Sequence, residues 1–356
     1  MRKGLAFKSL ILDILGILVH FSSFPPAGIM DWIIGFAILI IKLGVVLVGL
    51  LLLAAYLVLL ERKFLGRLQI RYGPNRAGKF GLLQPLADTI KMLTKEDIVP
   101  EAADRALFLL APAVVAAEAL LIFAVVPFGT SVTILGKKIP LVITDLNVGL
   151  LYVFALASLG VYGVALGGWA SNSKYSLLGG IRGAAQMISY ELSLGLSLVP
   201  IVMLARSFSL VDIVRAQADY PFILVQPVSF IIFFISAMAE TKRIPFDLPE
   251  AENELGAGYH TEYSGMRFGL FFLGEYVNLQ VFGALLAVFF LGGWRGPFLP
   301  PVVWFLLKIL VVSVLMIWVR GTLPRLRYDQ LMDLGWKVLV PLALINIVVT
   351  GAVLLI

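Results

Sequence analysis

The sequence contains no cysteine and only two histidines among its 356 residues. Without cysteine there can be no disulfide framework, no thiolate set for an iron–sulfur cluster and no cysteine nucleophile. His20 and His260 are the only imidazoles that could bind a metal ion. We therefore expect no metal site and no covalently held redox centre in this chain.

Charge is scarce as well: 14% of the residues are Asp, Glu, Lys or Arg, and 60% are apolar before the 33 glycines are counted. Soluble globular domains usually contain about 25% charged and about 45–50% apolar residues, glycine included. Only a few short connecting segments carry the charge that a soluble domain needs. The composition thus predicts a polypeptide that faces lipid.

Helical runs that cross a hydrocarbon core about 30 Å thick need roughly 20 apolar residues. Eight runs qualify, at residues 32–60, 106–126, 146–170, 184–204, 222–239, 268–291, 301–319 and 336–356. The sequence therefore predicts an all-α polytopic membrane protein with about eight transmembrane helices, amphipathic surface helices and cytoplasmic loops. Residues 32–356 would form a single transmembrane helical domain.

Residues 1–31 form an N-terminal extension with a shorter apolar run at 10–24. This run has the length of an interfacial segment, and an extra membrane helix stays open. Its basic flank resembles that of a signal peptide, but no small-residue cleavage site follows, so we do not expect cleavage.

Lysine and arginine are distributed unevenly over the connecting segments. Seventeen lie in the loops at residues 61–105 and around Lys174, Lys242 and Arg325, against five in the opposite loops. By the positive-inside rule the first set is cytoplasmic. The net charge of +6 is then mainly a topology signal, and nucleic-acid binding is not expected because no stacking surface accompanies the bases.

One cytoplasmic segment has the pattern of an amphipathic helix with Pro85 in its first turn. Its apolar residues share one face: Leu82, Leu83, Leu86, Ile90 and Leu93. Such a helix lies either at the lipid surface or beneath a partner, and the pattern leaves both open.

The loop at residues 240–262 is acidic, contrary to the usual bias of cytoplasmic loops. It holds six carboxylates: Glu240, Asp247, Glu250, Glu252, Glu254 and Glu262. Asp247 and Glu250 have the spacing of a capping box that opens a short helix, and Glu250 and Glu254 would then share a face. Crowded carboxylates can hold protons near neutral pH, whereas the simpler alternative is a solvated loop that compensates a helix dipole.

Several ionisable side chains fall inside the predicted spans, where they are costly and therefore functional candidates. They are Glu118, Glu191, Glu275, Lys42 and Lys308. Their number suggests a polar, hydrated path through the bundle. Neutralised pairs, or lysines whose long stems reach an interface, are the alternative.

Three long strings of the sequence carry a family resemblance. They are ERKFLGRLQIRYGPNRAGKFGLLQPLADTIKMLTKED (61–97), GWASNSKYSLLGGIRGAAQMISYE (168–191) and AETKRIPFDLPEAENELGAGYHTEYSGMRFGLFFLGEY (239–276). Together with FLGGW (290–294) and RGTLPRLRYDQLMDLGW (320–336), they closely resemble the H-type membrane subunit of bacterial NADH-quinone oxidoreductase. This is the family of the mitochondrial NADH dehydrogenase subunit 1, and the resemblance extends from about Leu43 to near the end of the chain.

The resemblance implies a membrane-arm component of respiratory complex I in the bacterial inner membrane. Such a component contacts the hydrophilic arm and forms much of the chamber through which the substrate quinone enters. Its partners would be the hydrophilic subunits of the quinone site and antiporter-like membrane subunits. FMN and iron–sulfur clusters are expected in partner subunits only.

The resemblance also implies roles for individual residues, none of them a catalytic residue or a metal ligand. Matching the motifs assigns to the quinone chamber and its entrance Glu61, Arg62, Lys63, Asp247, Glu250, Glu252 and Glu254. It assigns to a proton or charge path Glu191, Glu240, Glu262 and Glu275, with Arg182 and Arg267 as counter-charges.

Three features depart from the family pattern. Glu118 stands where an apolar residue is expected, and Leu159 where some relatives place a glutamate. The N-terminal extension through Asp31 is also atypical. Two other functions stay open: the homologous subunit of a membrane-bound hydrogenase-type complex, and a stand-alone secondary ion transporter. Inverted repeats would favour the transporter, and we find no internal repeat in the sequence.

Overall fold

The computed structural model describes residues 29–134 and 137–355, so the apolar run predicted at 10–24 lies outside the described residues. Within this part, seven helices are long and apolar enough to cross a membrane. They are α2 (Ile29–Leu68), α4 (Arg105–Ile122), α5 (Gly149–Ala170), α6 (Lys174–Ala205), α10 (Gly265–Phe290), α11 (Pro301–Thr322) and the continuous run of α12 (Tyr328–Asp333), η3 (Leu334–Leu339) and α13 (Val340–Leu355). The prediction of an all-α polytopic membrane protein is confirmed.

The span predicted at residues 222–239 is shorter than expected. It forms α8 (Pro227–Glu240), which has 14 residues and is about 21 Å long at 1.5 Å per residue. Pro227 lies in its first turn, where a missing N–H costs nothing. Because α8 ends early, its last residue lies inside the bundle, and the chain turns there among neighbouring helices.

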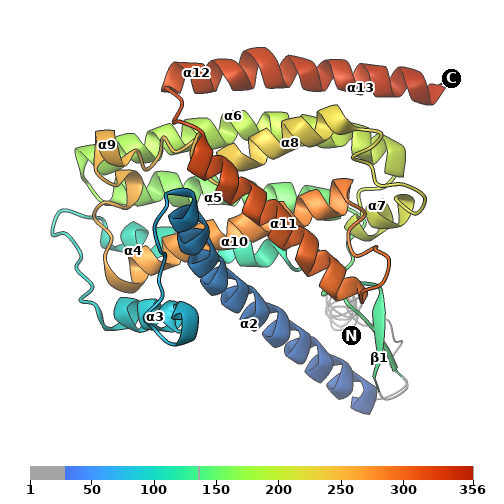
Figure 1. Cartoon of the computed structure of the whole chain (residues 1–356), viewed down its shortest axis with the longest axis horizontal. Coiled ribbons are helices and arrows are strands. Elements are labelled where there is room, and N and C mark those ends of the chain that lie inside the picture. The colour runs from blue at the N-terminus through green and yellow to red at the C-terminus, as the bar shows by residue number, and fades with distance from the viewer. Residues whose placement is uncertain (1–28, 135–136, 356) are drawn as a thin grey trace, which may run out of the picture.

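Helix α10 lies at the centre of the bundle and packs against α2, α4 and α11 (Figure 1). Its apolar stretch is the most buried of the seven. Helices α5, α6, α8 and α13 run nearly parallel to one another, whereas α2 and α11 cross the bundle at an angle (Figure 1). The centre is filled by aliphatic and aromatic side chains of α6, α8, α10 and α11.

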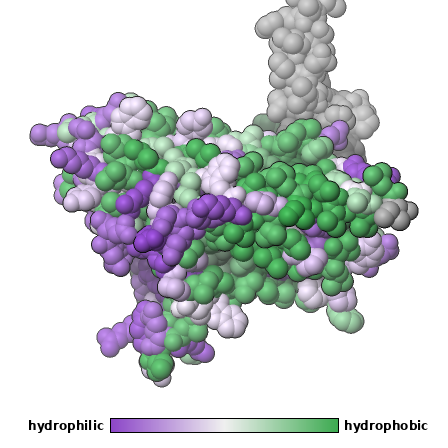
Figure 2. Space-filling model, turned by 90° about the horizontal axis from the view of Figure 1, so that it is seen from above, coloured by the Kyte–Doolittle hydropathy of each residue, from purple (hydrophilic) through white to green (hydrophobic). Residues whose placement is uncertain are grey.

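The outer helices expose apolar side chains, as a lipid-facing surface requires. Most of the apolar stretch of α2 is exposed, and so is most of α13. Figure 2 shows a hydrophobic surface over the middle of the molecule and a hydrophilic region gathered at one end.

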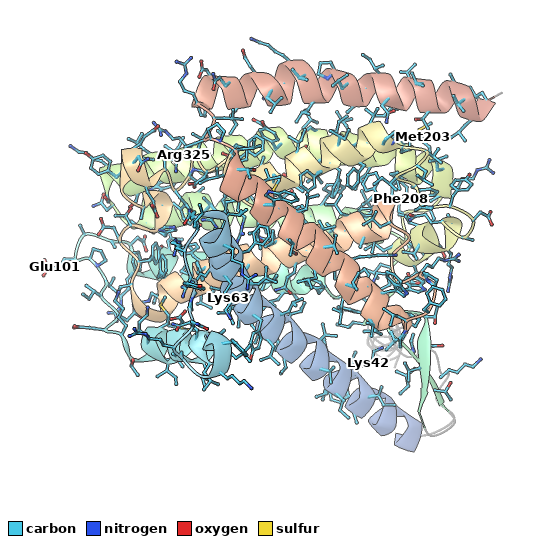
Figure 3. The ribbon with its side chains drawn as sticks, viewed as in Figure 1. Lys42, Lys63, Glu101, Met203, Phe208 and Arg325 are labelled. Carbon is cyan, nitrogen blue, oxygen red and sulfur yellow. The ribbon has the colours of Figure 1, made fainter. Side chains whose placement is uncertain are left out.

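The polar loops gather at this end, which we call the loop-rich end. Lys63, Glu101 and Arg325 lie toward it, whereas Lys42 and Phe208 lie toward the opposite end (Figure 3). The loop-rich end carries the short elements η1 (Lys79–Gly81), α3 (Gln84–Thr94), α9 (Glu252–Leu255) and η2 (Gly258–His260). The opposite end carries α7 (Leu210–Ala216) and an antiparallel hairpin of β1 (Ser131–Ile134) and β2 (Lys137–Pro140), in which Ser131 lies opposite Pro140.

The predicted amphipathic surface helix is confirmed as α3, with Pro85 in its first turn. The five apolar side chains of the predicted face are exposed, namely Leu86, Ile90 and Leu93, together with Leu82 and Leu83 just before the helix. This face is free to meet lipid or a partner.

The capping box predicted in the acidic loop is wrong. The short helix α9 begins at Glu252, and its N-cap is Ala251, which makes no side-chain cap hydrogen bond. Asp247 is instead bound by Arg325, a residue distant in sequence. A tertiary ion pair has therefore replaced the local hydrogen bond that the spacing favours.

The two lysines predicted inside spans both reach backbone carbonyls. Lys42 Nζ donates to the carbonyl of Val142 at 2.8 Å. Lys308 Nζ donates to the carbonyls of Leu291, Gly293 and Arg295 at 2.6, 2.8 and 2.6 Å, just beyond the end of α10. Positive charge at a helix C-terminus is stabilising, so Lys308 has a structural role.

Candidate functional site

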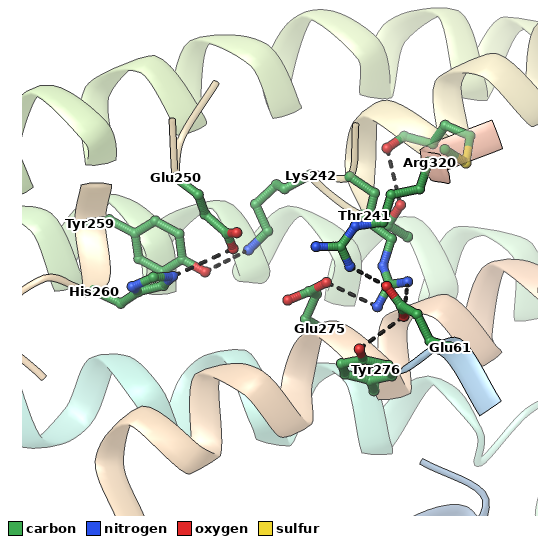
Figure 4. A network of polar contacts seen from close by, with 11 residues as sticks. Glu61, Thr241, Lys242, Glu250, Tyr259, His260, Glu275, Tyr276 and Arg320 are labelled. Atoms are coloured by element: carbon green, nitrogen blue, oxygen red, sulfur yellow. Dashed lines mark hydrogen bonds and ion pairs between the residues drawn. The ribbon is translucent and has the colours of Figure 1, made fainter. Parts of the chain in front are cut away.

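Five charged or polar side chains form a connected, largely buried group between α2, α10, α11 and the end of α8 (Figure 4), which we call the arginine cluster: Glu61, Arg243, Glu275, Tyr276 and Arg320. Arg243 is at its centre and is 1% exposed. Its Nη1 lies 2.7 Å from Oε2 of Glu61, and its Nη2 lies 3.0 Å from Oε1 of Glu275. The Arg243 guanidinium therefore bridges two carboxylates inside the bundle.

The remaining contacts of the cluster converge on Glu61. Arg320 Nη1 pairs with its Oε1, and the Tyr276 hydroxyl donates to its Oε2 at 2.9 Å. The Arg243 guanidinium also lies 4.5 Å from the centre of the Tyr276 ring. Burial alone would lower the pKa of Arg243, but Glu275 and Glu61 outweigh this and raise the pKa above its usual range. The guanidinium thus stays charged.

The position of Arg243 follows from the short length of α8. The helix ends at Glu240, and Arg243 follows within the turn, so its side chain enters the bundle between α2 and α10. Glu275 and Tyr276 are central residues of α10, and Glu61 is in the last third of α2. The cluster therefore joins four separate parts of the chain.

Asp247 and Glu250 of the acidic loop point inward at the loop-rich end. Asp247 Oδ2 lies 2.7 Å from Nη2 of Arg325, and its Oδ1 has no hydrogen-bond partner among the described residues. Burial and the nearby charge of Glu250 raise the pKa of Asp247 to about 7, against the opposing effect of Arg325. Glu250 Oε1 lies 3.5 Å from Nε2 of His260.

A buried lysine lies between the acidic loop and the bundle. Lys242 is 4% exposed, and its Nζ donates to the Tyr259 hydroxyl at 3.4 Å (Figure 4). Its Nζ also lies 5.0 Å from the centre of that ring. Gly258, which precedes Tyr259, has a φ of +61° and packs directly against Pro249, since an added Cβ would lie 1.8 Å from the carbonyl oxygen of Pro249.

The other residues matched to the acidic loop lie nearer the surface. Glu252 and Glu254 are exposed on α9, and Glu254 Oε2 pairs with Nη1 of Arg182 at 2.6 Å. Glu262 is half-buried in the turn before α10 and takes part in none of the ion pairs of the described residues. Arg267 pairs with Asp97 at 3.0 Å.

The two basic residues matched to the quinone entrance connect α2 to the segment around α3. Arg62 Nη1 pairs with Oδ2 of Asp88 at 2.7 Å, and Lys63 Nζ donates to the carbonyl of Phe80. These contacts hold α3 beside the end of α2. The preceding residue of α2, Glu61, belongs to the arginine cluster, so α3 lies near that cluster.

Deeper in the bundle, Glu240 and Glu191 line one small cavity with apolar neighbours. Its volume is about 10 Å³, which is room for about one water molecule. Glu240 is 5% exposed, and its Oε2 has no partner among the described residues. The Ser158 hydroxyl donates to Oε1 of Glu191. A buried carboxyl with a free oxygen next to a water-sized space is suited to receiving and passing a proton.

The model of a family described as NADH dehydrogenase matches residues 41–351. The chain belongs to this family. Its relatives include an H-type subunit of NADH-quinone oxidoreductase from Syntrophobacter fumaroxidans, which is 79% identical over 91% of this chain and 98% of its own. The H-type subunit of Syntrophotalea carbinolica is 63% identical over 90% of this chain and 98% of its own, and one from Geobacter sulfurreducens is 67% identical over 88% and 95%.

Membership of the NADH dehydrogenase family confirms the resemblance deduced from the motifs. The structure brings Glu61 and Glu275 together in the arginine cluster, and it brings Glu240 and Glu191 together around the cavity. Glu252 and Glu254 lie at the surface, away from both groups. Within the described residues there is no group of three or more Asp, Glu or His side chains that could hold a metal ion.

The sequence interpretation missed the interior cations. It treats Arg243, Arg320 and Lys242 only as topology signals and assigns the counter-charges to Arg182 and Arg267. In the structure Arg182 and Arg267 pair with Glu254 and Asp97, away from the interior carboxylates. The available signal was the position of Lys242 and Arg243, two and three residues after Glu240 and inside the longest acidic motif.

Proposed function

We propose that this chain is the multi-pass membrane subunit of a bacterial proton-translocating NADH:quinone oxidoreductase. In this role it forms the quinone-access chamber at its loop-rich end and couples quinone reduction to proton translocation. FMN and the iron–sulfur clusters belong to partner subunits, and antiporter-like subunits receive the signal within the membrane. The observation that carries the proposal is the set of buried carboxylates that extends from the acidic loop to Glu191.

The chamber is assigned to the side where α2, α3 and the acidic loop meet. A quinone has a polar head group and a long apolar tail, and this region offers both environments. The exposed leucines and isoleucine of α3 suit the tail. Glu61, Asp247 and Glu250 supply polar groups for the region where the head group reacts.

Coupling follows from the protons that quinone reduction consumes. Because the pKa of Asp247 is about 7, this side chain can supply a proton at neutral pH and recover it afterwards. A change of charge at the acidic loop acts on Lys242, whose charge affects both Glu250 of that loop and Glu240. The protonation of Glu240 then changes in response, since nearby ionisable groups titrate as a set.

The test is Glu240→Gln in the complete complex, in sealed membrane vesicles. We expect NADH:quinone turnover and the associated proton translocation to fall about tenfold or more, because the amide cannot hold the transferred proton. Reduction of an artificial acceptor by the hydrophilic arm should stay normal. Glu101→Gln, at an exposed loop carboxyl, is the matched control.

Normal turnover and normal translocation in Glu240→Gln would refute the coupling role. Isolation of the chain in mild detergent tests the assembly directly. A large complex that contains flavin and iron–sulfur proteins supports the proposal, whereas a small oligomer of this chain alone would favour the stand-alone transporter.

A further inference from the structure

Glu118 is a buried carboxyl that the family motifs do not explain. It lies in α4, is 4% exposed, and its Oε1 accepts a hydrogen bond of 2.8 Å from Nδ2 of Asn278 in α10. The other side of the carboxyl lies against α5 at Gly160, where an added Cβ would be 2.8 Å from Oε1 and 3.1 Å from Cδ. Any side chain at position 160 would therefore occupy the place of the carboxyl.

This site lies one helical turn from the cavity of Glu240 and Glu191. Residues three or four apart share a helix face, and one turn rises about 5.4 Å. Glu118 of α4, Gly160 of α5 and Asn278 of α10 meet at this site. On each of these helices the residue one turn away lines the cavity, namely Ile122, Ala157 and Val281. The relation holds on all three helices, so the carboxyl and the cavity are adjacent layers of one site.

The charges around Glu118 place it within the same electrostatic group. The charges of Glu118 and Glu191 both act on Glu240, and Lys242 acts on Glu118. From α10, Asn278 faces the carboxyl, and Glu275 of the arginine cluster precedes Asn278 by one turn. Position 160 of α5 adds no titratable group. Glu118 thus lies between the arginine cluster and the cavity carboxylates.

We propose that Glu118 is a further proton-holding carboxyl of the interior path, which lies one turn from the cavity, exchanges a proton with Glu240 and is positioned by Asn278. In this step a proton leaves the Glu240 carboxyl, which becomes a carboxylate, and binds the Glu118 carboxylate, which becomes neutral. The total charge of the group is unchanged. The inference rests on the proposed coupling function and adds a member from α4 to it.

A purely structural role would be a polar contact that joins α4 to α10. Such a contact needs only an acceptor for the Asn278 amide, which a glutamine oxygen provides equally well. An acid in a membrane-spanning helix is far more costly than an amide, so the presence of an acid indicates that its proton is used. The two roles therefore differ in how they respond to Glu118→Gln.

The experiment compares Glu118→Gln with the unchanged complex in sealed vesicles. Glutamine keeps the size of the side chain and the hydrogen bond from Asn278, so assembly and artificial-acceptor activity should stay normal. We expect coupled NADH:quinone turnover to fall about tenfold or more. One band of a protonated carboxyl should also disappear from the infrared difference spectrum of quinone reduction.

Glu240→Gln, measured in parallel, distinguishes failure of the Glu118 role from failure of the coupling function. If Glu240→Gln impairs coupling and Glu118→Gln changes neither the turnover nor the infrared spectrum, this inference is overturned and the proposed function stands. If neither variant impairs coupling, the proposed function fails as well. Should Glu118→Gln not assemble, Glu118→Asp and Glu118→Asn give the same comparison, because only the aspartate side chain can hold a proton. Coupled turnover in Glu118→Asp but not in Glu118→Asn supports the inference. Equal coupled turnover in the two variants overturns it.

Discussion

Replacing Arg243 by methionine removes the central cation of the arginine cluster while nearly keeping the length and apolar volume of the side chain. Glu61 keeps its contact with Arg320, but Glu275 loses the ion pair that it makes in the structure. One buried negative charge is then uncompensated. We expect this variant to destabilise the centre of the bundle.

The magnitude follows from how buried the pair is. The side chain of Arg243 is 1% exposed, and those of Glu61 and Glu275 are 4% and 11% exposed. Removing one partner of such a pair costs about 3–5 kcal/mol. The ion pair of Arg182 with Glu254 provides the matched control, because its side chains are 34% and 53% exposed. Arg182→Met should cost less than about 1 kcal/mol.

Amide hydrogen exchange of the assembled complex measures these costs locally, as the free energy of opening of peptides from α10 and α6. Arg243→Met should lower the protection of residues 265–290 by the larger amount. Adding Glu275→Gln to it should restore most of the loss, because it removes the uncompensated charge. Equal effects of Arg243→Met and Arg182→Met, or no recovery in the double variant, would refute the reasoning.

Two further predictions concern the acidic loop. Asp247 is protonated below its pKa of about 7 and ionised above it. Turnover that uses this proton therefore falls as the pH rises through about 7. Asp247→Asn should give a low rate that lacks this pH-dependent fall. A pH profile of NADH:quinone turnover measures this, and an unchanged limb in the variant would assign the titration to another group. Gly258→Ala should displace η2 and lower the thermal stability of the complex, since its Cβ would overlap the carbonyl of Pro249. Gly256 is the control, because it has a comparable φ of +76° but open space around an added Cβ. Gly256→Ala should therefore cost only the backbone strain of about 1–3 kcal/mol. A loss of thermal stability in Gly258→Ala no greater than in Gly256→Ala would contradict the predicted overlap.

The helices were predictable from the sequence because a membrane requires long apolar runs whose backbone polar groups are satisfied within the helix. Each of the eight predicted runs contains a helix in the described residues, although the run at 222–239 begins its helix only at Pro227. The amphipathic pattern of α3 was equally informative, since the lipid or partner surface imposes a single apolar face. The capping box failed because Arg325 binds Asp247 from a distant loop.

The candidate site was predictable only where motifs marked it. The motif carboxylates Glu61, Glu191, Glu240 and Glu275 are all in buried or half-buried positions. Their grouping into an arginine cluster and a cavity was not predictable, because each group combines residues from helices that are far apart in sequence. The partners Arg243 and Arg320 resemble ordinary loop bases until the short α8 places one of them inside the bundle.

Sequence alone therefore determined that this chain is a multi-pass helical membrane protein of the NADH dehydrogenase family, because hydropathy and long motifs are local properties of the chain. The tertiary structure decided which charges meet. An ion pair such as Arg243 with Glu61 joins residues 182 positions apart, and its energy depends on burial and distance, which only the packed bundle fixes. Glu118 shows the same dependence, since its carboxyl becomes a candidate proton site only when α4, α5 and α10 enclose it beside Glu240.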